Sequence, residues 1–182
     1  MPFKLDLATE RLNLSALRLE DAQDFLAGLN DYRILKMVGS WPYPLTMDYV
    51  TTRFQAVVRK AHSTDFVLTI RNGSALVGTI GAYQLQDEGE DAWSIGFMSA
   101  MTFWGQGLMT EAVQAVCWHV ATTQEAPDIM ADVFVENVAS MRVLEKCGFI
   151  RQGEPEYGWS EARQEESLCH KFWLRPNRKI PS

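Results

Sequence analysis

Residues 103–112 read FWGQGLMTEA and place two glycines one residue apart, between a strand-like run and a helix-like run. A helix N-terminus carries unpaired N–H groups and a partial positive charge, so it binds anions where side chains leave room. Gly105 and Gly107 remove side chains at this point. The stretch predicts an anion-binding turn, although a tight strand-to-helix turn without a ligand has the same composition.

Two familiar phosphate-binding loops do not match this turn. The P-loop pattern GxxxxGK[ST] is absent from the stretch. The dinucleotide pattern GxGxxG fails because Thr110 stands where its third glycine would be. If an anion binds here, another type of loop holds it.

Length and composition are those of one globular domain. The chain has 182 residues, of which 47% are hydrophobic and 22% charged, and no repeat or linker divides it. We therefore expect residues 1–182 to form a single mixed α/β domain. The net charge of −6 disfavours a nucleic-acid partner, because nucleic-acid-binding faces need clustered Lys and Arg.

Cysteine and histidine are scattered along the chain without the spacing of metal ligands or of a disulfide framework. They stand at Cys117, Cys147, Cys169, His62, His119 and His170. We expect no metal and a reducing, cytoplasmic location. The start of the chain lacks a signal-like segment, and no apolar run approaches the ~18 residues that cross a bilayer, so no membrane partner is expected.

Apolar periodicity and turn residues predict the order of the elements. Strands are expected at residues 11–17, 66–70, 75–85, 92–98, 128–135, 149–153 and 167–174. Helices are expected at residues 19–29, after Thr46 to about Arg59, at residues 108–120 and at residues 139–147. Asn72 and Gly73 predict a tight hairpin between the second and third strands. The sum is a central sheet covered by helices.

A second candidate stretch is ENVASMRVLEKCGF at residues 136–149. Asn137 ends a strand, and Ser140 stands three residues on, so both side chains can face the start of the next helix. The simplest interpretation is that Asn137 caps this helix and Ser140 supports the cap. Gly148 suits the left-handed position that ends a helix.

In this order and at this separation, WGQGLMTEA and ENVASMRVLEKCGF resemble the GNAT superfamily of acetyl-CoA-dependent N-acetyltransferases. TERLNL at residues 9–14, WPYP at residues 41–44 and LVGTIG at residues 76–81 look like its branch of ribosomal-protein alanine N-acetyltransferases. The five motifs cover most of the chain. The resemblance implies a mostly antiparallel sheet of about six or seven strands, splayed at the cofactor site by a bulge and flanked by helices.

The resemblance also implies a site for acetyl-CoA as cosubstrate. Amides of residues 104–110 would hold the pyrophosphate, and the backbone of the splayed strand would pair with the pantetheine arm as an added strand does. One free N–H of that strand would stabilise the tetrahedral oxyanion. The implied cofactor-binding residues are Phe97, Met98, Trp104, Gly105, Gln106, Gly107, Leu108, Met109, Thr110, Asn137 and Ser140.

The implied reaction is direct attack of a neutral primary amine on the thioester carbonyl, without an acyl-enzyme. Ser140 stands where the relatives place a hydroxyl near the thioester sulfur, and it is the candidate general acid or hydrogen-bond donor. Glu111 matches a glutamate often seen in the family, but a carboxylate at a helix start also favours the helix dipole. Glu136 and Glu154 are the alternative bases.

Two positions depart from the family pattern. Trp104 stands where Arg or Gln is usual, so the pyrophosphate would depend more on amides than on a side-chain cation. Met109 stands where Gly or Ala is usual, and it either crowds the phosphates or turns into the core.

The sequence leaves the acceptor open between a protein N-terminus and a small-molecule amine. Trp41, Tyr43 and residues 157–159 are candidates for shaping its pocket. A noncatalytic acyl-CoA-binding or regulatory module on the same fold is the alternative function. An open edge strand near the C-terminus would allow two subunits to pair as a homodimer.

Overall fold

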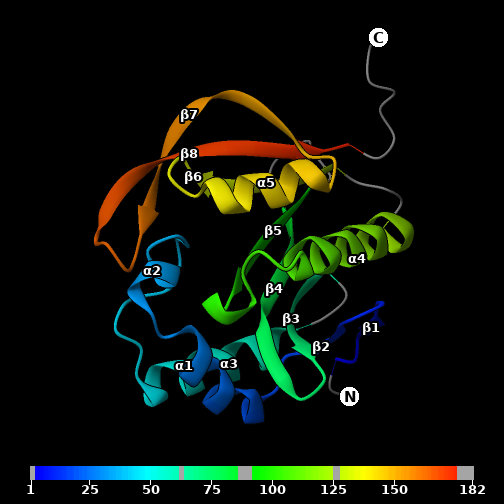
Figure 1. The fold of residues 1–182 in the computed structure, drawn as a ribbon, viewed down its shortest axis with the longest axis vertical. Helices are drawn as coiled ribbons and strands as arrows, with labels where there is room; N and C mark the ends of the chain where they lie inside the picture. Colours follow the sequence, from blue (N-terminus) through cyan, green and yellow to red (C-terminus); the bar gives the residue numbers. More distant parts are fainter. Residues whose placement is uncertain (1–2, 62–63, 86–91, 125–127, 176–182) are drawn as a thin grey trace.

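One open sheet organises the molecule (Figure 1). The computed structural model describes residues 3–61, 64–85, 92–124 and 128–175, and eight strands in this part pair in the order β1-β2-β3-β4-β5-β6-β8-β7. All neighbours are antiparallel except β5 and β6, so the predicted mostly antiparallel sheet is confirmed, with eight strands instead of six or seven. The strands are β1 (Asp6–Ala8), β2 (Asn13–Ala16), β3 (Asp65–Asn72), β4 (Ala75–Leu85), β5 (Ala92–Ser99), β6 (Asp128–Phe134), β7 (Ile150–Ser160) and β8 (Glu165–Leu174).

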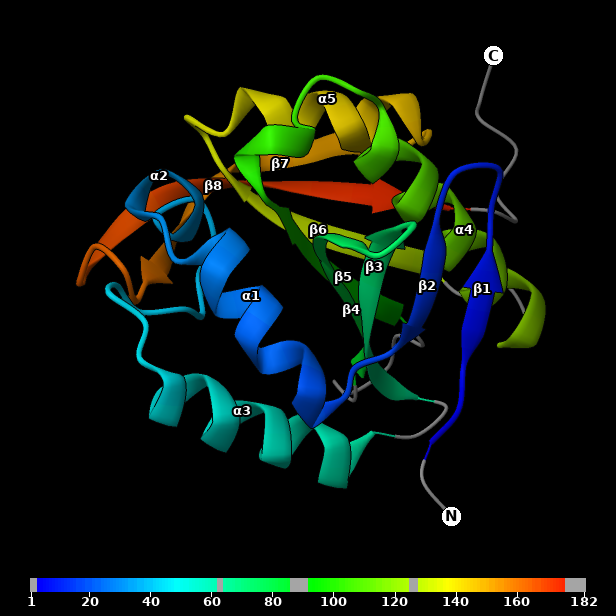
Figure 2. The same ribbon diagram turned by 60° about the horizontal axis from the view of Figure 1, so that its bottom comes forward.

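Helices cover both faces of the sheet, and each face has its own apolar cluster. One cluster lies between the sheet and α4 and α5, and the other joins α1, α2 and α3 to the opposite face. Figure 2 shows α1 and α3 side by side, apart from α4 and α5. The helices are α1 (Ala22–Leu29), α2 (Tyr32–Leu35), α3 (Met47–Lys60), α4 (Leu108–Thr123) and α5 (Val138–Lys146), with 3₁₀ turns η1 (Leu19–Asp21) and η2 (Met101–Phe103).

The apolar spacing of α4 explains why this segment is helical. Its buried residues recur every three or four positions and form one face against the core. They are Leu108, Ala112, Val113, Val116, Cys117 and Val120. Within the described residues, no helix is long and apolar enough to cross a membrane.

Three elements differ from the sequence prediction. β1 is only three residues long and is held by pairing Leu7 with Leu14 of β2, which is too short for a periodic signal. The one-turn helix α2 begins where the Asp31 carboxylate accepts from Arg33 N at 2.8 Å. β7 continues to Ser160 past an irregularity between Gln152 and Glu156, whereas we expected it to end at residue 153.

The sheet splits between β5 and β6. These strands pair only over Ala92↔Asp128, Trp93↔Ile129 and Ser94↔Met130, although β5 continues to Ser99 and β6 to Phe134. The predicted splay is therefore present. The expected bulge in β5 is wrong, because Ala92–Ser99 pair with β4 in an unbroken register. The strands separate because each follows its outer neighbour, β4 or β8.

Candidate active site

The glycine turn before α4 is open on the outside. Gly105 and Gly107 have φ angles of 74° and 77°, a left-handed conformation that other residues adopt only with strain. A Cβ added at Gly105 would meet no atom within 4 Å, and one at Gly107 would lie 3.6 Å from Arg11 Nη2. No side chain caps the helix at Gly107. The first amides of α4 therefore lack a side-chain acceptor and are accessible to an anion.

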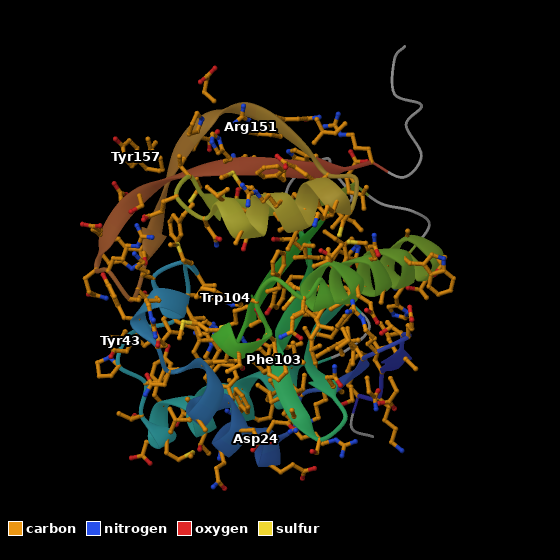
Figure 3. All side chains as sticks on the ribbon, in the orientation of Figure 1. Asp24, Tyr43, Phe103, Trp104, Arg151 and Tyr157 are labelled. Carbon is orange, nitrogen blue, oxygen red and sulfur yellow. The ribbon has the colours of Figure 1, made fainter. Side chains whose placement is uncertain are left out.

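Side chains around the turn fix its shape without filling it. Trp104 Nε1 donates to Ser99 O at 3.0 Å, and Gln106 Nε2 donates to Thr102 O at 2.8 Å. Arg11 Nη1 donates to Gln106 O at 2.9 Å, so the connection between β1 and β2 is joined directly to the turn. Trp104 remains 49% exposed. Figure 3 shows Trp104 and Phe103 where the turn enters α4.

Glu111, in the first turn of α4, is engaged with the N-terminal segment. Its carboxylate accepts from Thr9 Oγ1, from Arg11 N at 2.9 Å and from Arg11 Nε at 2.7 Å. Burial alone would raise the pKa of Glu111, but these hydrogen bonds and the Arg11 charge outweigh burial and lower it. Glu111 is absent from the lining of the cavity described below. This contact explains the TERL segment as a clamp on the glycine turn.

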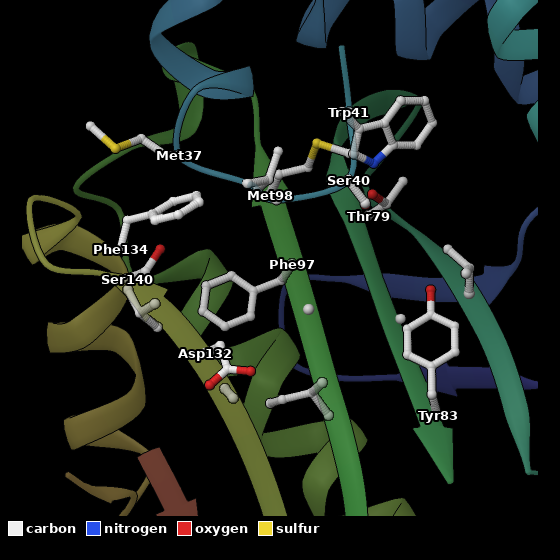
Figure 4. Close-up of a pocket in the computed structure, with 18 of the residues that line it drawn as sticks. Met37, Ser40, Trp41, Thr79, Tyr83, Phe97, Met98, Asp132, Phe134 and Ser140 are labelled. Atoms are coloured by element: carbon white, nitrogen blue, oxygen red, sulfur yellow. The ribbon is translucent and has the colours of Figure 1, made fainter. Parts of the chain in front are cut away.

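A cavity of about 380 Å³ lies at the split (Figure 4). Phe97 and Met98 of β5 line it, together with Asn137 and Ser140 at the start of α5. Figure 4 shows the Phe97 ring between β5 and β6, with Ser140 on the β6 side. Four of the predicted cofactor residues therefore meet at one cavity.

Asn137 caps α5 and also ties it to a distant loop. Its Oδ1 accepts from Ser140 N at 3.1 Å, and its Nδ2 donates to Met37 O at 3.4 Å. The predicted cap is confirmed. The Ser140 hydroxyl lines the cavity and makes no hydrogen bond to any described residue, so it is available to a ligand.

Comparison with known proteins identifies the family. A family model described as an acetyltransferase (GNAT) domain matches residues 11–150. This chain belongs to the GNAT acetyltransferase family. The resemblance in the sequence is confirmed, and the chain belongs to a class of acetyl-CoA-dependent acyltransferases.

Individual relatives agree with this assignment. Probable N-acetyltransferase YjcK of Bacillus subtilis (strain 168) is 31% identical over 102 residues, which are 56% of each chain. N-acetyltransferase p20 of Bacillus licheniformis is 26% identical over 150 residues, covering 81% of this chain and 83% of that protein.

Solved structures share the whole fold. A putative ribosomal-protein-serine acetyltransferase from Vibrio cholerae has a TM-score of 0.80 at 19% identity and covers 97% of this chain and 100% of that one. RimL, a ribosomal L7/L12 alpha-N-protein acetyltransferase solved with coenzyme A, has a TM-score of 0.80 at 18% identity, covering 94% and 98%. At these identities the likeness concerns the fold alone.

The residues of this GNAT chain fit acetyl-CoA. Among the described residues, no side chain caps the α4 N-terminus, and β5 has no sheet partner on its β6 side after Ser94. Both features supply free backbone groups, which phosphates and an extended amide arm require. Met109 does not crowd the turn, because its partly buried side chain packs against the core cluster.

The mouth of the cavity on the α3 side contains residues that the sequence analysis missed. Arg53 of α3 stacks over the Trp41 ring at 4.2 Å and donates to Ser40 O at 2.7 Å and Ser40 Oγ at 3.0 Å. Tyr83 of β4 and Asp132 of β6 line the same mouth. The signal for Asp132 was present, since DIMADVFV carries a second acidic residue in its middle, between apolar neighbours. Arg53 and Tyr83 had no such signal.

The remaining candidates are divided between the cavity lining and other parts of the surface. Glu136 pairs with Arg163, whose side chain is only 8% exposed and also donates to Lys36 O at 2.8 Å. Glu154 is exposed on β7 and does not line the cavity. Trp41 and Trp159 line the cavity, but Tyr43 and Tyr157 do not. Figure 3 shows Tyr43 and Tyr157 projecting outward.

Among the described residues, no three His, Cys, Asp or Glu side chains lie close enough together to hold a metal ion. Burial raises the pKa of Cys117, and it raises the pKa of Cys147 to about 11, so both are inert thiols at neutral pH. His119 packs edge-on against the Phe66 ring at 6.0 Å, and burial lowers its pKa. His62 lies outside the described residues.

Proposed function

We propose that this protein transfers an acetyl group from acetyl-CoA to a primary amine, either a protein N-terminus or a small molecule. The split between β5 and β6 carries the proposal. It forms one cavity that reaches from the start of α5, at Asn137 and Ser140, to the mouth at Arg53 and Asp132. An acyl donor and an amine could therefore meet from opposite faces of the sheet.

Different residues of the chain would bind different parts of acetyl-CoA. Amides of residues 104–110 would bind the pyrophosphate, with the Thr110 hydroxyl as a further donor. The free edge of β5 at Phe97 and Met98 would pair with the pantetheine arm, and Asn137 would bond it from α5. One β5 N–H would stabilise the oxyanion, a contribution of a few kcal/mol in other acyl-transfer enzymes.

Ser140 is the proposed donor to the leaving sulfur. Its hydroxyl faces the cavity and is free of other partners among the described residues. A serine hydroxyl has too high a pKa to give up its proton easily, so polarisation of the sulfur by a hydrogen bond is the role that fits it.

The acceptor class has two supported candidates. RimL is named for a ribosomal-protein N-terminus, and another fold neighbour, the microcin C7 self-immunity acetyltransferase MccE, is solved with acetyl-CoA and AMP. The mouth here combines the aromatic side chains Trp41, Tyr83 and Trp159 with charged Arg53 and Asp132. A peptide N-terminus and a small polar amine both match this mixture. A noncatalytic acyl-CoA-binding module remains the alternative.

Calorimetric titration of acetyl-CoA, followed by an assay of CoA release with peptides and small amines, tests the proposal. We expect binding to wild type and its loss in Gly107→Val. Gly153→Val is the matched control, because Gly153 on β7 has a φ of 73° and lies outside the cavity lining. Binding without CoA release for every amine would favour the noncatalytic module. Absence of binding to folded wild type would reject the acetyltransferase proposal.

We further propose a cytoplasmic single-domain enzyme that can pair through β7. This strand lies at the edge of the sheet, next to β8 only, and exposes Ile150, Tyr157 and Trp159. Unpaired edge strands are ready sites for pairing between chains. Light scattering that gives a monomer mass at high protein concentration would reject the homodimer.

A further inference from the structure

Asp132 of β6 faces the acceptor side of the split. Its neighbours Ile129, Ala131 and Val133 are buried in the cluster shared with α4, so the alternation of the strand turns Asp132 to the other face. It is the second residue after the last β5–β6 pair, Ser94↔Met130. Figure 4 shows its carboxylate in the gap between β6 and β5, below Phe97 and Ser140.

The space beside Asp132 is open. Gly96 of β5 lines the same mouth, and a Cβ built on it would meet no atom within 4 Å. Ser94 and Tyr83 complete this part of the lining. An acceptor amine entering from the α3 side would therefore reach the carboxylate before it reached the Ser140 side of the cavity.

Asp132 is also unengaged, in contrast to the other candidate bases. It makes no hydrogen bond or ion pair with any described residue. Lys171 lies opposite Asp132 on β8, but its ammonium donates a hydrogen bond to the Glu156 carboxylate at 2.7 Å. Glu111 and Glu136 already hold Arg11 and Arg163, respectively. Of these carboxylates, only Asp132 lines the cavity.

The cavity wall and the charges around Asp132 set its proton affinity. Asp132 is exposed at the mouth, but partial desolvation of its carboxyl raises the pKa, the Lys171 charge lowers it and the Glu156 charge raises it, with a net increase. The Cys169 thiol of β8 is nearby, and Arg53, Tyr83 and Glu161 line the same mouth. A higher carboxyl pKa reduces the free-energy cost of proton transfer from an ammonium to this carboxylate.

We infer that Asp132 is the general base of the reaction, which holds the acceptor ammonium at the mouth and takes a proton from it. The inference rests on the proposed acetyl transfer. The ammonium N–H bond breaks and the proton goes to an Asp132 carboxylate oxygen. The freed nitrogen lone pair then forms the bond to the acetyl carbon.

The remaining proton transfers need neither an oxidant nor a metal ion. The second proton on nitrogen leaves to solvent as the C–S bond breaks. The departing thiolate, which accepts a hydrogen bond from Ser140, takes one proton back from water. Asp132 finally returns its own proton to solvent. Asp132 and Ser140 thus act on different reactants, Asp132 on the amine and Ser140 on the leaving sulfur.

The test compares Asp132→Asn with Glu161→Gln, a control that removes another carboxylate of the same mouth. We expect Asp132→Asn to lower kcat/KM about 100-fold, the lower end for loss of a general base, and to abolish the acidic limb of the pH profile. Acetyl-CoA affinity, measured by calorimetry, should not change. Asp132→Glu, which keeps a carboxylate, should recover part of the activity and the limb.

Each outcome separates this inference from the proposed function. Activity and a pH profile of Asp132→Asn equal to those of wild type would overturn the role of Asp132 alone. An equal loss in Glu161→Gln, or an Asp132→Asn defect confined to acetyl-CoA binding, would also overturn it. Wild type that releases no CoA with any amine would overturn the proposed function, and this inference with it.

Discussion

The two helices beside the split begin in opposite ways. α4 starts at Gly107, in a left-handed conformation and without a side-chain cap, so its first amides face outward. α5 starts at Asn137, whose side chain accepts from Ser140 N at 3.1 Å. The first N–H groups of a helix are satisfied by its own residues, by water or by a ligand. α4 leaves them open to solvent or a ligand, and α5 satisfies one of them itself.

This difference assigns a separate task to each helix. The open start of α4 suits negative charge, because unpaired amides and the helix dipole act together there. The capped start of α5 suits positioning, because Asn137 fixes the first turn that carries Ser140 and also donates to Met37 O. Variants at the two starts should therefore affect different steps.

We expect the largest effect, a loss of acetyl-CoA affinity, from a substitution in the glycine turn before α4. Gly105→Val should weaken acetyl-CoA binding about 100-fold, since each amide bond to a charged oxygen contributes about 1.5–3 kcal/mol and the side chain would disturb several. Gly153→Val is matched to it, because the φ angles are 74° and 73° and neither Cβ would meet an atom within 4 Å. Calorimetry that finds equal affinities for the two variants would contradict an open, ligand-binding α4 start.

Ser140→Ala tests the residue that the capped start positions. We expect turnover to fall about tenfold, equal to roughly 1.4 kcal/mol of transition-state stabilisation, because one hydrogen bond to the leaving sulfur is lost. Acetyl-CoA affinity should stay nearly constant. Steady-state rates with saturating cosubstrate measure the first quantity and calorimetry the second. Unchanged turnover would remove Ser140 from the catalytic residues.

Asn137→Ala tests the cap itself. Loss of an N-cap costs about 1 kcal/mol, which for a chain of this size lowers the melting temperature by about 2–4 °C. Asn137→Asp keeps the acceptor oxygen for Ser140 N and replaces the donor to Met37 O with a carboxylate oxygen, whose charge the helix N-terminus favours. Its melting temperature, followed by circular dichroism, should lie close to that of wild type. An equal loss in both variants would show that the Met37 contact, rather than the cap, stabilises this region.

The smallest effect is expected at Glu111. Glu111→Gln should reduce the free energy of unfolding by less than about 1 kcal/mol, because Arg11 is partly exposed and such ion pairs contribute little. The folded pKa of Glu111 lies below its ordinary 4.5, so its stabilisation is present above that pH and is lost as pH falls through the folded pKa. Urea unfolding at a series of pH values should show the difference between the two proteins shrinking below about pH 4. A constant difference would contradict this linkage.

The glycine turn and the α5 cap could be predicted from the sequence because their physics is local. A positive φ at Gly105 and Gly107 and a cap at Asn137 depend on residues within a few positions of one another. The main strands and long helices were predicted for the same reason, since apolar periodicity is a local pattern. β1 and α2 were missed because three or four residues carry too short a pattern.

The mouth of the cavity was predicted only in part, because the sequence analysis named Trp41 and residues 157–159 but not the charged residues beside them. The mouth joins Ser40, Arg53, Tyr83, Asp132 and Trp159, which come from five separate segments of the chain. No spacing in the sequence links them. The sequence also could not show which candidate carboxylates are already paired. Arg11 and Arg163 contact Glu111 and Glu136 only once the sheet has folded.

The family, the order of the main elements and the candidate phosphate-binding turn could be inferred from the sequence, because each rests on contiguous residues. The position of the split in the sheet and the side chains that line the opening became apparent only in the folded chain. The split exists because β5 and β6 follow different neighbours after three shared pairs, and that divergence depends on the pairing of the whole sheet. It leaves Asp132 free at the mouth while the other candidate carboxylates, Glu111, Glu136 and Glu154, lie outside the cavity lining.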